Sequence, residues 1–183
     1  MVMVMEILAI AHRSIGAPEI HAARGDQALL AHRNDEAYEC AVLGRHEEAI
    51  DRYADLLVDE LVVLGPVHPI TLATRNNLGL TCSAIGLYDE AVVLLGSLVA
   101  DEIETLGALH TTTLATRNNL ALTYLAMGLH DDAIRMFDSV LADEMMALGS
   151  DHVTTLATQC NLALARAATA AGDPNLADLS SVG

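Results

Sequence analysis

A 42-residue repeat constrains this chain more than any other feature of its sequence. Residues 64–105 and 106–147 are identical at 22 of 42 aligned positions, and both contain the run Leu-Ala-Thr-Arg-Asn-Asn-Leu, at 72–78 and 114–120. A third copy begins at Leu148, and a more divergent copy precedes residue 64. Self-similarity at a fixed period of this size is characteristic of stacked repeat architectures. The sequence therefore predicts that each copy forms one structural unit that packs on the next.

Each copy has the pattern of two helices. In the copy that begins at Leu64, apolar residues at three-to-four spacing predict a first helix over about 69–85, with proline in its first turn. Gly86 is placed to end this helix, and a second helix begins at Asp89, where carboxylates suit the positive end of a helix dipole. Signals for strands are almost absent. The pattern predicts an all-α fold made of antiparallel helix pairs.

The charge balance excludes several classes of partner. The chain has 25 acidic residues and 9 basic ones, all arginine, for a formal net charge of -16. A charge this negative argues against binding to nucleic acid or to an anionic membrane surface. No apolar run approaches the length of a membrane span. The three cysteines show no framework spacing, which favours a reducing compartment, and we expect a cytoplasmic protein.

The repeated motif is similar to that of a known family. The pattern Gly-x-x-His-x-x-Thr-Leu-Ala-Thr-Arg-Asn-Asn-Leu, followed by Gly-x-x-x-(Asp/Glu)-Ala, resembles the tetratricopeptide repeat in the 42-residue form of the kinesin light chains. The resemblance covers roughly residues 24–171 and implies a right-handed superhelical solenoid of antiparallel helix pairs. We expect an N-terminal helix and connector at 1–23, three helix pairs plus a terminal helix at 24–171, and a tail at 172–183.

The resemblance also implies a binding groove for a peptide or protein segment. In such arrays the first helices line a concave face, and a side-chain amide there offers both a donor and an acceptor to a peptide backbone. Neighbouring arginines would offer forked donors to carboxylate or phosphate groups. The predicted groove residues are Arg75, Asn76, Asn77, Arg117, Asn118, Asn119 and Asn161. The alternative is that these residues only make hydrogen bonds between repeats.

Histidines and paired acids also recur with the repeat. His68, His110 and His152 lie 42 residues apart, as do the Asp-Glu pairs that begin at Asp59 and Asp101. Such residues can bind metal or transfer protons, but one set per repeat suits a connector between helices, and each histidine is placed to cap or brace a turn. Equivalent positions in stacked repeats lie about 10 Å apart, too far for one metal site. We therefore predict no metal and no cofactor.

The same spacing argues against a disulfide between Cys40 and Cys82, and no nucleophile motif or phosphate loop is present. No catalytic residue is predicted. The leading hypothesis is a non-catalytic scaffold for protein–protein interaction, and whether the chain is an enzyme stays open. The alternatives are a small-molecule-binding or catalytic auxiliary protein of a biosynthetic pathway, and an acidic decoy for a basic protein.

The ends of the array are partly apolar, because Leu156, Leu162 and Leu164 lie in the last copy and Met1 to Met5 contain three methionines. We expect either self-association through the ends, as a homo-oligomer, or docking on a larger protein. The alternative is that polar residues near Arg166 cap the array.

Overall fold

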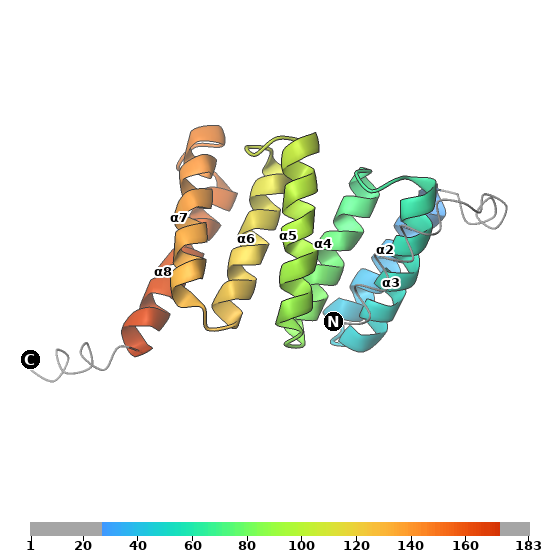
Figure 1. Ribbon diagram of the computed structural model, residues 1–183, viewed down its shortest axis with the longest axis horizontal. Helices are drawn as coiled ribbons and strands as arrows, with labels where there is room; N and C mark the ends of the chain where they lie inside the picture. Colours follow the sequence, from blue (N-terminus) through green and yellow to red (C-terminus); the bar gives the residue numbers. More distant parts are fainter. Residues whose placement is uncertain (1–26, 173–183) are drawn as a thin grey trace, which may run out of the picture. The chain divides into compact units, whose positions relative to one another are not determined.

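The computed structural model describes residues 27–172, and within this range every regular element is an α-helix (Figure 1). The residue contacts divide the chain into two units that meet between Thr105 and Leu106. The first unit contains α2 (Gln27–Val42), α3 (His46–Val63), α4 (Pro69–Ala84) and α5 (Tyr88–Thr105). The second unit contains α6 (Thr111–Ala126), α7 (His130–Ala147) and α8 (Val153–Gly172). The prediction of an all-α fold is confirmed.

The predicted domain boundaries stay predictions. The expected N-terminal helix and connector at 1–23, with its three methionines, and nearly all of the expected tail at 172–183 lie outside the described residues. Between them the helices follow the predicted order of three pairs and a terminal helix.

The turn inside each helix pair depends on glycine. Gly86 has a φ of 84°, in the left-handed region that favours glycine. The Leu87 N–H then donates to the carbonyl of Cys82 at 2.9 Å, which closes the end of α4. The same arrangement recurs in the second unit, where Gly128 has a φ of 78°. The predicted end of the first helix at Gly86 is therefore confirmed.

Histidine caps the first helix of three repeats. The His68 Nδ1 accepts a hydrogen bond from the backbone N–H of Ile70 at 3.3 Å, and Pro69 occupies the first helical position. His110 and His152 make the same bond to the second residue after them, at 3.2 Å in each case. Each bond satisfies one of the N–H groups that a helix start leaves without an intrahelical partner. The predicted capping role of these histidines is confirmed.

We expect the His110→Ala substitution to lower the free energy of unfolding by about 1 kcal/mol, because alanine cannot accept this bond. His110→Asn should retain most of the stability, since asparagine is among the best capping residues. Urea unfolding followed by circular dichroism at 222 nm measures both variants against wild type. Equal losses in the two variants would show that the imidazole acts through packing instead of capping.

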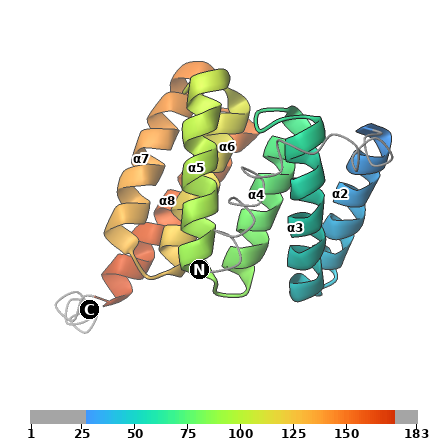
Figure 2. The ribbon, with the colours of Figure 1, turned by 45° about the vertical axis from the view of Figure 1, so that its right-hand side comes forward.

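The first unit has a continuous apolar core. Neighbouring helices pack side by side, as the views of α2 beside α3 and of α4 beside α5 show (Figures 1 and 2). The core comprises Ala37, Cys40, Ala49, Ile50, Tyr53, Leu57, Leu78, Cys82, Ala91 and Leu94. A Cβ atom at Gly79 would lie 2.8 Å from Cγ of Leu95, so α4 and α5 approach each other closely there. This confirms Gly79 as a position of close helix crossing.

The second unit builds its core around one aromatic ring. Phe137 on α7 is fully buried and packs with Ala121, Ala133, Leu162 and Ala165. Ala121 stands where the first unit has Gly79, 42 residues earlier. The second unit thus uses a larger residue at the crossing of its first two helices.

The cysteines are all free thiols. Cys40 and Cys82 are buried in the first unit, and Cys160 is exposed on α8. Burial raises the pKa of the Cys82 thiol to about 11. A thiol this weakly acidic is almost entirely protonated at neutral pH and is a poor nucleophile.

At α8 only part of the predicted apolar end is exposed. Leu162 is buried in the core, whereas the side chains of Leu156 and Leu164 are exposed. Arg166 pairs with Asp138 of α7 at 2.9 Å, as a polar cap would require. Self-association through this end stays a prediction. No helix between residues 27 and 172 has the length and hydropathy of a membrane span.

Candidate functional site

Each of the repeated arginines binds a carboxylate on the second helix of its own pair. Nη1 of Arg33 lies 2.7 Å from Oδ2 of Asp59, and Nη1 of Arg117 lies 2.7 Å from Oδ2 of Asp143. Arg75, which is buried, lies 2.6 Å from its aspartate, Asp101. Charge-assisted hydrogen bonds of this length are stronger than neutral ones. The three pairs join the two helices of each repeat.

Arg75 and Arg117 also bind a serine of the following helix. Nη2 of Arg117 donates to Oγ of Ser139 at 2.9 Å, and Nη2 of Arg75 donates to Oγ of Ser97 at 3.3 Å. These contacts account for the predicted arginines as structural residues. Contact between either guanidinium and a peptide stays a prediction, and these bonds do not favour it.

In the first unit, asparagines link the two first helices. Nδ2 of Asn77 on α4 donates to Oδ1 of Asn34 on α2 at 3.3 Å. Asn34 in turn donates to the hydroxyl of Thr74, and this hydroxyl donates to Oε1 of Glu60 at 3.0 Å. The result is a hydrogen-bonded chain that begins at the half-buried Asn77 and ends at a buried carboxyl group.

The second unit repeats this network 84 residues later. Nδ2 of Asn161 on α8 donates to Oδ1 of Asn118 on α6 at 3.1 Å, and Asn118 donates to the hydroxyl of Thr158. Asn118 is buried and Asn161 is half-buried. One hydrogen bond uses only part of an amide, which has two N–H donors and an oxygen that can accept two bonds. Asn77 and Asn161 therefore keep hydrogen-bonding capacity.

The other two predicted asparagines, Asn76 and Asn119, are half-buried on α4 and α6, and both take part in interactions. The structure thus brings the predicted residues together within each unit. It shows that hydrogen bonding between repeats, the alternative interpretation, accounts for much of the pattern. Binding of a peptide by these residues stays a prediction.

The glutamates of the repeated acidic pairs are buried. Glu60, Glu102 and Glu144 are fully inaccessible. Burial raises the pKa of Glu60 from its ordinary 4.5 to about 7, and the bond from Thr74 and the charge of Arg33 oppose this only in part. Burial likewise raises the pKa of Glu144, against the opposing effect of the Thr158 hydroxyl. These groups cannot be assigned to a groove, because solvent does not reach them.

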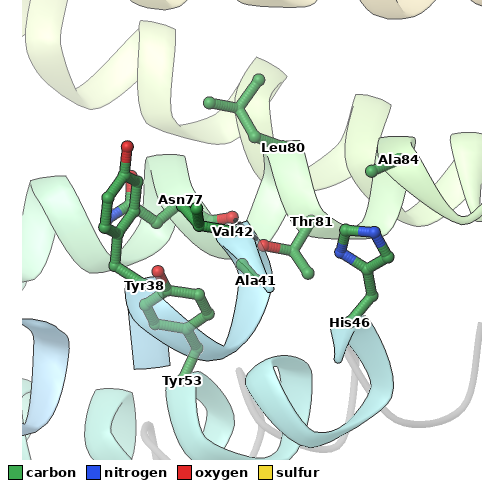
Figure 3. Close-up of a pocket in the computed structure, with 9 residues that line it drawn as sticks. All are labelled: Tyr38, Ala41, Val42, His46, Tyr53, Asn77, Leu80, Thr81 and Ala84. Atoms are coloured by element: carbon green, nitrogen blue, oxygen red, sulfur yellow. Dashed lines mark hydrogen bonds between the residues drawn. The ribbon is translucent and has the colours of Figure 1, made fainter. Parts of the chain in front are cut away.

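The structure also contains a pocket that the sequence analysis did not predict. It encloses about 200 Å³ between α2, α3 and α4 of the first unit (Figure 3). Its walls include Asn77, Tyr38, Tyr53 and His46. One signal for it was present in the sequence, because the repeats differ in side-chain size at positions that line the pocket.

Among residues 27–172, no group of three or more histidine, cysteine or acidic side chains is arranged to hold a metal ion. The repeated histidines are occupied as helix caps, with Nδ1 accepting a backbone N–H.

Antiparallel helix pairs that recur every 42 residues define an all-α helical repeat protein. The chain belongs to the tetratricopeptide repeat family, whose model matches residues 37–100 and 112–178. The predicted family is thereby confirmed, and repeats of this kind generally mediate protein–protein interaction.

Solved structures place the repeats closer to one class. The crystal structure of nearly identical TPR-like repeats from a Podosopora anserina protein assigned to the kinesin light chains is 31% identical, with a TM-score of 0.69. The match covers 76% of this chain and 66% of that one. A substituted form of the same repeats is 26% identical over 97% of this chain and 84% of that one, with a TM-score of 0.70. A search of curated proteins finds no significant match.

Proposed function

We propose that this protein is a non-catalytic interaction module that binds an extended peptide segment of a partner along the first helices of its repeats. The observation that carries the proposal is the network that occurs once in each unit. In both networks a half-buried asparagine, Asn77 or Asn161, lies at the end of the hydrogen-bonded chain and has unused donors and acceptors. Amide groups held in place by a buried network are preorganised for a peptide backbone, which lowers the entropic cost of binding.

The charge of the module indicates the kind of segment it takes. Every arginine between residues 27 and 172 pairs with a carboxylate of the chain itself. The chain as a whole carries a net charge of -16. No arginine in this range is therefore left over for an acidic ligand. We infer that the partner segment is neutral or basic, in place of the acidic segment that the arginines alone would indicate.

We expect the double variant Asn77→Ala and Asn161→Ala to bind the partner at least tenfold more weakly, because each substitution removes hydrogen bonds to the ligand backbone. Affinity capture from the source lysate with tagged wild type identifies the partner, and titration of the purified pair measures the loss. The matched control, Asp55→Asn with Asp131→Asn, changes exposed residues on the second helices α3 and α7. Circular dichroism confirms that each variant folds.

Unchanged affinity in a folded double variant would contradict binding at the asparagines. A loss of equal size in the Asp55 and Asp131 control would place the interface on the second helices instead.

A further inference from the structure

The pocket of the first unit is small, open to solvent and mainly apolar. Apart from its polar groups, its walls are aliphatic, from Ala41, Val42, Leu80 and Ala84. In Figure 3, Tyr38, Tyr53 and Asn77 gather at one end of the pocket, and His46 lies at the other. No arginine or carboxylate lines it. A charged ligand group would be desolvated here without a partner, so the pocket favours a neutral one.

Two buried polar atoms face this space without a hydrogen bond of normal geometry. The side chain of Tyr53 is 0% exposed, and its hydroxyl finds no such partner among the described residues. Nδ1 of His46 is buried in the same way. Burial also raises the pKa of Tyr53 to about 12, although the neighbouring Asn77 amide opposes the shift, so the phenol stays neutral and able to donate. Buried groups of this kind carry a free-energy penalty that a ligand can remove.

The second unit shows how the same site looks when it is filled by the chain itself. Eighty-four residues after Ala41 and Tyr53, the chain has Leu125 and Phe137. Leu125 packs against the cluster that contains Phe137, and no hydroxyl is present at that position. The first unit therefore has less side-chain volume at one position and an additional polar group at the other. Both differences favour an occupant that comes from outside the repeat.

We propose that this pocket binds the phenol group of a tyrosine side chain from the partner segment. The half-exposed ring of Tyr38, 55% accessible, offers an edge or face to a second aromatic ring. The ligand hydroxyl pairs with the Tyr53 hydroxyl or with Nδ1 of His46. The inference rests on the proposed function, because Asn77 contributes both to the pocket wall and to the asparagine network.

The first test uses the isolated side-chain group, p-cresol, and the full chain labelled with ¹⁵N. We expect saturable amide shifts at Ala41, Asn77 and Thr81, with a dissociation constant on the order of 1 mM for so small a ligand. Toluene, which lacks the hydroxyl, should bind about three- to tenfold more weakly, since it leaves the buried polar atoms without a partner.

Two variants copied from the second unit separate the contributions of shape and hydrogen bonding. Ala41→Leu should abolish binding of both ligands, because leucine fills the space as Leu125 does. Tyr53→Phe should remove the preference for p-cresol over toluene and leave toluene binding unchanged. Ala157→Leu, at an exposed position of α8, is the control and should bind as wild type does.

A capped Gly-Tyr-Gly peptide distinguishes the source of the phenol. Binding of both p-cresol and this peptide, each lost in Ala41→Leu, supports the proposal. Binding of p-cresol alone would indicate a free small molecule as the ligand and overturn it. Ligand shifts that appear only when the protein is diluted would show that a second copy occupies the pocket, and would also overturn it.

If neither ligand shifts the pocket resonances at about 10-fold the expected dissociation constant, the pocket holds only water and the proposal is wrong. The proposal of peptide binding is unaffected by that outcome, because the Asn77 and Asn161 double variant tests it with the partner itself. Ala41→Leu changes neither asparagine.

Discussion

Glu60→Gln is expected to stabilise the protein by about 2–3 kcal/mol more at pH 8 than at pH 4, relative to wild type. The folded state holds the Glu60 proton up to about pH 7, whereas the unfolded chain releases it near the ordinary 4.5. Between these values the folded state binds more protons than the unfolded one, so wild-type stability falls as the pH rises. Glutamine does not ionise, and its oxygen can still accept the bond from Thr74. The variant therefore lacks this loss.

Urea unfolding at pH 4, 6 and 8 measures the difference between the two proteins directly. The control is Glu39→Gln, which makes the same chemical change at an exposed position of α2. We expect the Glu39 variant and wild type to have parallel stability curves across this range. A constant difference between Glu60→Gln and wild type would show that the folded and unfolded states release this proton together.

Phe137→Ala should lower the free energy of unfolding by about 3–5 kcal/mol, because it removes a fully buried ring and leaves a cavity. The surrounding core consists largely of alanine and leucine on three helices, Ala121, Ala133 and Leu162 among them. Small side chains have few alternative rotamers with which to fill the space, so we expect the loss to lie toward the upper part of this range. Thermal and urea unfolding measure it.

The control for this prediction is a substitution that the chain itself contains. Leu95 stands where the last pair has Phe137, and it is also fully buried. We expect Phe137→Leu to cost less than about 1.5 kcal/mol, since most of the apolar volume is kept. If alanine and leucine at this position cost the same, shape at the ring edge matters more than buried volume.

The helix pairs could be predicted because their signals are local. Gly86 requires a left-handed backbone, Pro69 fits a first helical turn, and both recur or have equivalents at the repeat period. The histidine caps could be predicted for the same reason, since a cap involves residues only two positions apart. The period of 42 residues added the pairing order. No tertiary information was needed for any of these features.

The candidate site could be predicted only in part. The repeat register identified the asparagines, but the bond from Asn77 to Asn34 joins residues 43 positions apart, and its direction depends on how α2 packs on α4. The arginines were assigned to a ligand because their partners, Asp59 and its equivalents, lie on another helix. The pocket depends on a missing volume beside Ala41, which becomes visible only once the packing against Tyr53 is known.

The internal pairing of the arginines has a consequence for how a partner arrives. Because each positive charge between residues 27 and 172 is neutralised at close range, the field that extends into solvent is set by the unpaired carboxylates. Such a field accelerates the diffusional encounter with a basic segment and acts over about one Debye length, near 8 Å at physiological ionic strength. Added salt should therefore slow association far more than it speeds release. The neutral amides and the pocket would then govern the lifetime of the complex once the partner has docked.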